Sequence, residues 1–411
     1  MDGAYGPASA TALLAPCAAV PRSPCLRTRW ARAHLLSCGR PALASVCVPR
    51  ACAERNQYLS EYALHRSLLL SPQRVRSAAQ ADFFFVPFYS RLAYADKVAS
   101  RGVRRQQANL TQTLHACLRA SPWWRRSRGT DHVVAISSTR DPRKLFGAAW
   151  PQLRRAITLM IDTADARYPV RGDGRAGRSH RGGTGTTHEG EGGSRVTLPY
   201  FVPHFAEDDG VDAAAKEHSI CFFGSTTHPV RRRALQALAH VPGARLQLST
   251  FRHFNGSERA RQGERERTLS TRATLRRCKL CLVPAGMTPS SRRFYEALVA
   301  SCVPLIVSDR FEPAFTSLVP VHDYAVRAPQ DEPGLLPRVV ENALRRWLKL
   351  YAAVRAVRSS FIFDLGHRPP RSTATCDATS SLLEELLTRF AHRSAQEGSR
   401  SRCLARNPNR L

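Results

Sequence analysis

Residues Cys278 to Asp309 read CKLCLVPAGMTPSSRRFYEALVASCVPLIVSD, and this stretch decides the fold. Leu280–Val283 and Val303–Val307 are short apolar runs typical of strands that are buried on both faces. The residues between them that fall on one helical face, at i, i+3, i+4 and i+7, are Phe294, Ala297, Leu298 and Ser301. The stretch therefore predicts a parallel strand–helix–strand unit.

The loop between the first strand and the helix predicts an anion site. After Gly286, two hydroxyl residues, Ser290 and Ser291, stand where the helix begins and where its unpaired backbone N–H groups point outward. Arg292 and Arg293 fall in the first helical turn, where a cation is unfavourable beside the positive end of the helix dipole unless an anion is bound nearby. The ligand that this pattern favours is a phosphate.

Glu296 lies one turn further along the helix, on the face that it shares with Arg292 and Arg293. A carboxylate in this position can accept hydrogen bonds from ribose hydroxyls. The alternative is that Glu296 only pairs with the two arginines on the surface, since most strand–helix–strand units bind nothing at a given loop. The pattern alone leaves both interpretations open.

Strands and helices alternate along the rest of the chain in two blocks. Strands are expected over residues 83–86, 133–136 and 220–223, and helices over 58–70, 151–167, 230–239 and 382–391. Asp309 opens a stretch that we expect to be poor in helix. Gly224 ends a strand and Arg231 lies in the first turn of the next helix, which makes a second candidate anion site. The alternation predicts an α/β fold with two Rossmann-like lobes facing a cleft.

The charge of the chain raises the question of a polyanionic partner. Lys and Arg number 62 against 32 Asp and Glu, which gives a formal net charge of +30. The basic residues are nearly all arginine, a bias that a GC-rich coding sequence produces without selection for binding. Aromatic residues cluster in apolar runs such as Phe83–Phe88 and not between arginines, so no stacking platform for bases is visible. We expect no nucleic-acid partner.

The cysteines do not predict a metal site. Cys278 and Cys281 form a Cys-x-x-Cys pair, but no second Cys or His pair lies at a zinc-binding spacing. Cys281 and Cys302 fall on neighbouring strands of the predicted unit, either as buried thiols or as a disulfide. No Asp-x-Asp motif occurs either. We expect neither a metal nor another cofactor; the phosphate-containing ligand predicted above would be a co-substrate.

The sequence resembles the exostosin-type family 47 glycosyltransferases. The signature blocks are matched at Cys281–Gly286, Ser290–Ala297 and Cys302–Asp309, and residues 58–65, 81–88, 122–132 and 222–231 are similar to further family segments in the same order. The resemblance implies a GT-B fold and inverting transfer of a sugar from a nucleoside diphosphate donor, with uridine favoured, to a glycan or glycoprotein acceptor in the Golgi apparatus.

Together with composition, the resemblance predicts four regions. Residues 1–54 are a Cys- and Arg-rich segment that we expect to be poorly ordered, and residues 55–200 are an acceptor-side lobe with a disordered insertion over 171–195. Residues 201–365 are the nucleotide-sugar-binding lobe, and residues 366–411 are a helix and a basic tail. No stretch of about 18 apolar residues occurs, so a membrane anchor of the family's kind is missing. The acid-free N-terminal stretch makes plastid targeting an alternative.

The resemblance also implies roles for particular residues. The donor would be held by the predicted anion-site and ribose residues, which are Gly224, Arg231, Gly286, Ser290, Ser291, Arg292 and Glu296. The catalytic base would lie in the first lobe, with Asp131 and His132 at a strand edge as first candidates. Glu61 and His65 are second choices, although at i and i+4 they could simply pair with each other. Trp123 and Trp124 would either stack on a sugar or serve as core and rim.

One departure from the family supports a second hypothesis. Where the family has Pro-Arg-Gly-Asp, this chain has Pro284 to Met287, with Ala285 in place of the arginine. The alternative function is a catalytically inactive glycosyltransferase-like protein that binds a glycan or another polyanion, while retention of Arg292 and Glu296 favours the enzyme. The transferred sugar and the acceptor are not readable, because they depend on loops without a transferable motif.

Overall fold

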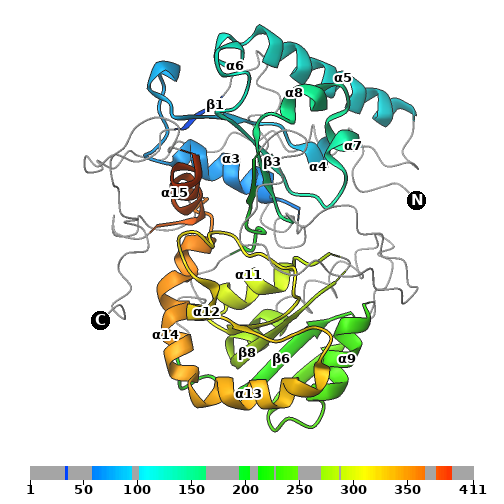
Figure 1. Cartoon of the computed structure of the whole chain (residues 1–411), viewed down its shortest axis with the longest axis vertical. Helices are drawn as coiled ribbons and strands as arrows, with labels where there is room; N and C mark the ends of the chain where they lie inside the picture. Colours follow the sequence, from blue (N-terminus) through cyan, green and yellow to red (C-terminus); the bar gives the residue numbers. More distant parts are fainter. Residues whose placement is uncertain are drawn as a thin grey trace.

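The protein is described here by a computed structural model over residues 33–35, 58–94, 101–162, 194–203, 212–225, 228–248, 270–286, 288–365 and 376–390. These residues form two five-stranded sheets, in the orders β1-β2-β3-β4-β5 and β10-β9-β8-β6-β7, and every pairing in both sheets is parallel. Figure 1 shows the two lobes, one above the other. The expected α/β fold with two Rossmann-like lobes, the GT-B arrangement, is confirmed.

The first lobe contains β1 (Ala33–Leu35), β2 (Phe83–Val86), β3 (His132–Ile136), β4 (Ile157–Met160) and β5 (Arg195–Thr197), with α3 (Ser60–Leu70), α4 (Ser90–Ala93), α5 (Arg101–Ala120), α6 (Pro122–Ser127), α7 (Pro142–Phe146) and α8 (Trp150–Leu153). The second contains β6 (His218–Gly224), β7 (Ala244–Leu248), β8 (Cys278–Pro284), β9 (Val303–Val307) and β10 (Val326–Arg327), with α9 (Pro229–Leu238), α11 (Arg292–Val299), α12 (Val321–Tyr324), α13 (Leu336–Arg345) and α14 (Trp347–Val357). α15 (Ala378–Phe390) follows.

The β8–α11–β9 unit forms as the quoted stretch predicts. β8 lies between β6 and β9, and its side chains are buried nearly throughout. α11 begins at Ser291, whose hydroxyl accepts a hydrogen bond from the Arg293 backbone N–H, so Ser291 is the N-cap. The helix ends at Val299, and Ser301, two residues further on, has a φ of 51°. That left-handed conformation is one that glycine adopts most readily, which gives a physical reason for the family's glycine at this position.

The predicted helix over residues 151–167 is wrong. The helical part ends at Leu153, and Ile157–Met160 form β4, buried along its whole length. A strand that is covered on both faces is apolar without alternation, so its pattern resembles that of a buried helix. The β-branched residues Ile157 and Thr158 favour the strand.

The stretch after Asp309 is not poor in helix, contrary to expectation. α13 and α14 follow one another there and lie along the outer side of the second lobe (Figure 1). Prolines at 320, 329, 333 and 337 interrupt the apolar periodicity just before α13 and within its first turn. Pro337 is nevertheless compatible with the helix, because a proline in the first turn leaves no intrahelical hydrogen bond unmade.

Of the predicted regions, the segment 1–54 contributes β1, which pairs with β2 and was not predicted as an element. The rest of that segment, the insertion over 171–195 except its last two residues, and the tail after Phe390 lie outside the described residues. Among the helices that the structure does describe, none has both the length and the apolar character needed to cross a bilayer.

The two lobes share one continuous core. The buried residues Tyr200, Phe201 and Val202 follow β5 and belong to the same apolar cluster as the side chains of β8, β9 and α11. The Phe201 backbone N–H donates to the Ser60 hydroxyl at the start of α3, at 2.9 Å. α15 then returns to the first lobe, where Ser67 on α3 donates a hydrogen bond to Asp377 at 2.9 Å. These contacts hold the carboxyl edges of the two sheets close to each other.

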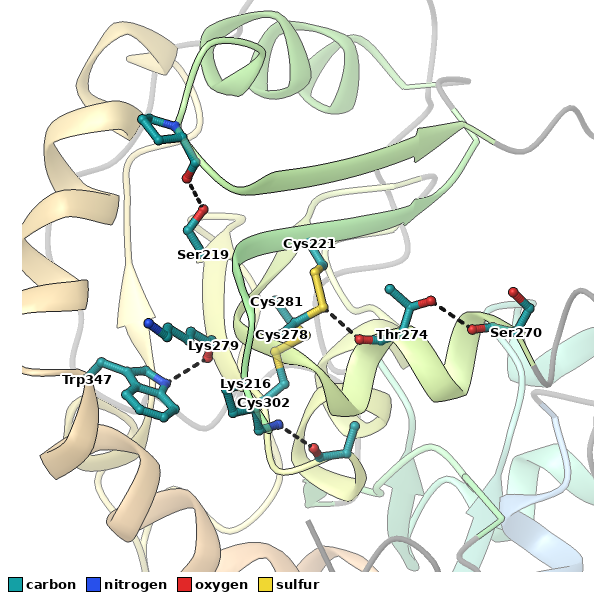
Figure 2. Close-up of a disulfide and its surroundings, with 12 residues drawn as sticks. Lys216, Ser219, Cys221, Ser270, Thr274, Cys278, Lys279, Cys281, Cys302 and Trp347 are labelled. Atoms are coloured by element: carbon teal, nitrogen blue, oxygen red, sulfur yellow. Dashed lines mark hydrogen bonds between the residues drawn. A yellow bond between two sulfur atoms is a disulfide. The ribbon is translucent and has the colours of Figure 1, made fainter. Parts of the chain in front are cut away.

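Two disulfides join the central strands of the second lobe (Figure 2). Cys221 on β6 is bonded to Cys278 on β8, and Cys281 on β8 is bonded to Cys302, the residue before β9. All four residues are buried. The disulfide alternative for Cys281 and Cys302 is confirmed, and the Cys-x-x-Cys pair is divided between two disulfides.

We expect the double change Cys281→Ala and Cys302→Ala to lower the free energy of unfolding by about 3 kcal/mol, because it removes a cross-link between residues 21 apart in sequence. The matched pair Cys221→Ala and Cys278→Ala spans 57 residues and should cost about 4 kcal/mol. Urea unfolding of the oxidised protein measures both values. Unchanged unfolding midpoints would contradict the assignment of these disulfides.

Candidate functional site

The loop between β8 and α11, residues 285–291, lies where the two lobes meet and is called the donor loop after the role predicted for it. The Ser290 hydroxyl donates to Asp162 Oδ2 of the first lobe at 3.1 Å and lies 3.2 Å from the Tyr200 hydroxyl. On its other side, the loop is held by Ser308, which donates to the Pro289 carbonyl at 2.9 Å. The N-terminus of α11 therefore faces the first lobe in a fixed position.

The first turn of α11 carries a partly buried ion cluster. Glu296 Oε1 lies 3.2 Å from Arg292 Nε, and Glu296 Oε2 accepts a hydrogen bond from Arg293 at 2.5 Å. The Arg292 and Glu296 side chains are only 16% and 18% exposed, so they are not a surface pair. Burial alone would raise the pKa of Glu296, but the guanidiniums of Arg293 and Arg292 outweigh it and hold that pKa below its ordinary value.

A further arginine reaches the same loop from α9. Arg231 Nε donates to the Ala285 carbonyl at 3.2 Å, and Arg231 Nη1 donates to the carbonyl of Ser225, the residue after Gly224, at 3.3 Å. A Cβ atom added at Gly286 would lie 2.6 Å from Arg231 Nη2, so the glycine leaves room for this guanidinium. Burial lowers the pKa of Arg231, and the positive charge of Arg293 adds to the effect.

The structure therefore brings together all seven residues predicted to hold the donor. They occupy the carboxyl ends of β6 and β8 and the first turns of α9 and α11, where helix N–H groups and hydroxyls favour an anion. Arg292 and Arg293 pair with Glu296, and Arg231 lies close enough to Arg293 for the two positive charges to repel each other. A diphosphate bound here would offset this concentration of positive charge.

Asp131 and His132 lie together but at the other edge of the first sheet. Asp131 precedes β3 and accepts hydrogen bonds from His132 Nδ1 at 2.7 Å and from Arg126 at 2.9 Å. The His132 ring is fully buried, stacked on Phe84 and edge-on to Trp124. β3 runs from this pair toward the lobe boundary, so the whole strand separates it from the donor loop. As catalytic residues the two stay a prediction, one that this location does not favour.

Trp124 is buried in the core of the first lobe, while Trp123 stacks on Phe84 and lies under the Arg126 guanidinium. The core-and-rim interpretation of the two tryptophans is confirmed.

Glu61 and His65 do not pair with each other. Glu61 is 3% exposed and accepts hydrogen bonds from the Ser90 hydroxyl at 2.5 Å and from the Ser137 backbone N–H at 2.9 Å. His65 Nδ1 lies 2.7 Å from the Tyr89 hydroxyl. Glu61 thus ties together the loops that follow β2 and β3, and burial raises its pKa to about 7, although its hydrogen bonds oppose the shift.

Asp162 is the site residue that the sequence analysis missed. It follows β4 at the carboxyl edge of the first sheet and contacts the donor loop directly through Ser290. The assignment of a helix over 151–167 hid it, because only a strand places its next residues at that edge. The signal was present: a carboxylate directly after a buried apolar run, Ile157 to Ile161, is typical of the ligand-facing end of a parallel strand.

The described residues contain no group of three or more His, Cys, Asp or Glu side chains arranged to hold a metal ion. The charged groups at this loop are the arginines of α9 and α11 together with the carboxylates of Asp162 and Glu296.

Two parallel sheets with an arginine-lined loop at the boundary between them form the arrangement of a two-lobed, GT-B glycosyltransferase. A sequence profile of the Exostosin GT47 domain matches residues 11–343. The chain belongs to the exostosin GT47 family of glycosyltransferases, as the sequence resemblance predicted.

Several plant proteins are similar to this chain. "Probable arabinosyltransferase ARAD1" of Arabidopsis thaliana is 27% identical over 305 residues, which are 71% of this chain and 60% of that protein. A probable glucuronoxylan glucuronosyltransferase of Arabidopsis thaliana is 24% identical over 85% of this chain and 70% of that protein. The chain thus spans less than two thirds of the length of the first relative and slightly more than two thirds of the length of the second.

Among solved structures, HepE of Anabaena in complex with UDP and glucose aligns with 88% of this chain and with its own whole length. The sequence identity is 11% and the TM-score is 0.40.

The raised pKa of Glu61 predicts a pH-dependent stability. Between about pH 4.5 and pH 7 the unfolded chain ionises this carboxyl while the folded chain keeps it protonated, so the folded state loses relative stability as the pH rises. We expect the wild type to lose about 3 kcal/mol relative to Glu61→Gln over this window. Denaturant unfolding at both pH values tests it, and a constant difference between the two proteins would contradict it.

Proposed function

We propose that this chain is an inverting glycosyltransferase that transfers a sugar from a uridine diphosphate donor to a glycan acceptor. The observation that carries the proposal is the gathering of three arginines at the N-terminus of α11: Arg231 contacts the loop before the helix, and Arg292 and Arg293 lie in its first turn. The names of the plant relatives support a sugar nucleotide as donor and a polysaccharide as acceptor, since they include an arabinosyltransferase and a glucuronoxylan glucuronosyltransferase.

The residues of this site have separate roles in the proposed reaction. In transfer, the bond between the sugar's anomeric carbon and the β-phosphate oxygen breaks, and the electron pair leaves with the diphosphate. That developing charge is stabilised by the helix N–H groups, the Ser291 hydroxyl and the arginines. These groups are already in position before the reaction, so they do not have to reorganise. Glu296, whose pKa lies below its ordinary value, stays ionised at neutral pH and can accept hydrogen bonds from the ribose hydroxyls.

The loss of the family arginine at Ala285 does not leave the loop without a cation. The Arg231 guanidinium donates to the Ala285 carbonyl and lies against Gly286, within the segment where the family arginine would stand. This contact favours an active enzyme over the inactive binding protein. The other departure, Met287, lies outside the described residues.

We propose a lumenal location in the Golgi apparatus. Two disulfides join β6, β8 and β9, and Cys117 and Cys376 are also disulfide-bonded. Disulfides of this number are typical of chains that fold in an oxidising compartment. Plastid targeting gains no support from them.

Isothermal titration with UDP, GDP, ADP and inorganic pyrophosphate tests the donor site. We expect UDP to bind with the lowest Kd, and we expect that binding to persist at about 0.5 M salt, at which screening removes most contacts with surface charges. The change Glu296→Gln should weaken UDP binding about tenfold or more but should leave pyrophosphate binding less affected, because a ribose contact is lost. Equal, salt-sensitive binding of all four ligands would favour the polyanion-binding alternative.

Gly286→Ala tests the role of Arg231 without removing a charge. A Cβ at this position displaces the end of a flexible side chain and no backbone atom, so we expect an unchanged melting temperature. UDP binding should weaken about tenfold, the value of one charge-assisted hydrogen bond. Gly334→Ala is the matched control, because a Cβ there meets nothing within 4 Å. Equal UDP affinity of both variants would exclude Arg231 from the donor site.

A further inference from the structure

The reaction needs a base on the side of the anomeric carbon opposite the leaving diphosphate. An inverting transfer places the acceptor hydroxyl and the leaving group on opposite faces of the sugar. With the diphosphate held by the second lobe, the base has to come from the first lobe and has to reach the boundary between them. The described residues that form the first sheet and its helices, 33–35, 58–94, 101–162 and 194–203, contain five carboxylates, which are Glu61, Asp82, Asp131, Asp141 and Asp162.

Position excludes two of them. Asp82 precedes β2 and Asp131 precedes β3, so both lie at the amino edge of the sheet, and the Asp131 carbonyl accepts a hydrogen bond from Phe84 of β2 there. The carboxyl ends of the strands, where the donor loop makes contact, lie at the opposite edge.

Existing contacts disfavour two more. Glu61 lies at the correct edge but is 3% exposed, and its two oxygens accept hydrogen bonds from Ser90, Ser137 and Arg91. Asp141 is the N-cap of α7, where it accepts from the Arg143 backbone N–H at 2.9 Å and also pairs with the Arg143 guanidinium. Both carboxylates serve the local structure of their own lobe.

Asp162 meets each requirement. It follows β4 at the carboxyl edge, it is partly exposed, and its Oδ2 accepts a hydrogen bond from Ser290, which is next to the N-cap of the diphosphate-binding helix. The Tyr200 hydroxyl lies 3.2 Å from the same Ser290 oxygen, so the Ser290 hydroxyl is held between Asp162 and Tyr200. One serine side chain separates this carboxylate from the loop that would hold the leaving group.

From this placement we infer that Asp162 is the catalytic base of the transfer. Resting on the function proposed above, the step is a direct displacement. The acceptor O–H proton passes to an Asp162 carboxylate oxygen while the acceptor oxygen forms a bond to the anomeric carbon. The bond from that carbon to the β-phosphate oxygen breaks, its electron pair leaves with UDP, and the anomeric configuration inverts.

Asp162→Asn separates this role from a structural one. The amide keeps an oxygen that can accept the Ser290 hydrogen bond, but it is not basic. UDP release from a panel of UDP-sugars is measured with water and with aryl glycosides as acceptors, and UDP affinity and melting temperature are measured on the same preparations. We expect kcat to fall by a factor of about 10² to 10⁴, with KM for the donor and the UDP Kd within about twofold of wild type. Ser290→Ala, which keeps the carboxylate, should lower kcat much less.

Asp82→Asn is the matched control at the far edge of the same sheet and should keep full activity. A kcat for Asp162→Asn within about threefold of wild type would overturn the inference. A large fall in kcat for Asp131→Asn, with Asp162→Asn near wild type, would point to Asp131 as the base. A wild-type chain that binds UDP but releases none from any donor would overturn both the base and the transferase activity. A chain that does not bind UDP would first contradict the proposed function.

Discussion

The ion cluster of Glu296 with Arg292 and Arg293 is the interaction on which the site depends. Charges that are removed from water are costly unless they are paired, and here Glu296 pairs with two guanidiniums while a third, that of Arg231, lies near Arg293. The cluster lies at the positive end of α11, which adds to the imbalance. Such a group of charges is stabilised when an anion is bound, so the same residues explain both the local electrostatics and the ligand class.

The position of the cluster follows from the parallel sheets. In each lobe the loops after the strands meet at one edge, and the shared core around Tyr200 and Phe201 holds the two edges against each other. The disulfides fix β6, β8 and β9, the strands of the second lobe that carry or flank the donor loop. Ser290 then joins the edges directly, since its hydroxyl contacts Asp162 and Tyr200. The predicted donor side of the site is therefore held in place against the first lobe.

Most of the donor half could be predicted from the sequence, and much of the acceptor half could not. The β8–α11–β9 unit is local in sequence, and its hydroxyls, arginines and Glu296 lie within one helical turn or two, so periodicity and capping rules were sufficient. The contact of Arg231 with Ala285 joins residues 54 apart, and only the sheet order brings them together. Asp162 was missed because β4 is buried on both faces and its apolar run was assigned to a helix. Asp131 was favoured because it borders a strand, but it precedes that strand, and the ligand-facing edge of a parallel sheet is the one at which the strands end.

A crystal structure of the chain with UDP tests the central claim most directly. The account predicts that the diphosphate lies at the N-terminus of α11, within hydrogen-bond distance of the Ser291 hydroxyl and the Arg231 and Arg292 guanidiniums, with the ribose beside Glu296. It also predicts that the Asp162 carboxylate faces the β-phosphate across the lobe boundary. A UDP molecule bound away from α11, with the ion cluster unchanged and no ligand near it, would contradict the account.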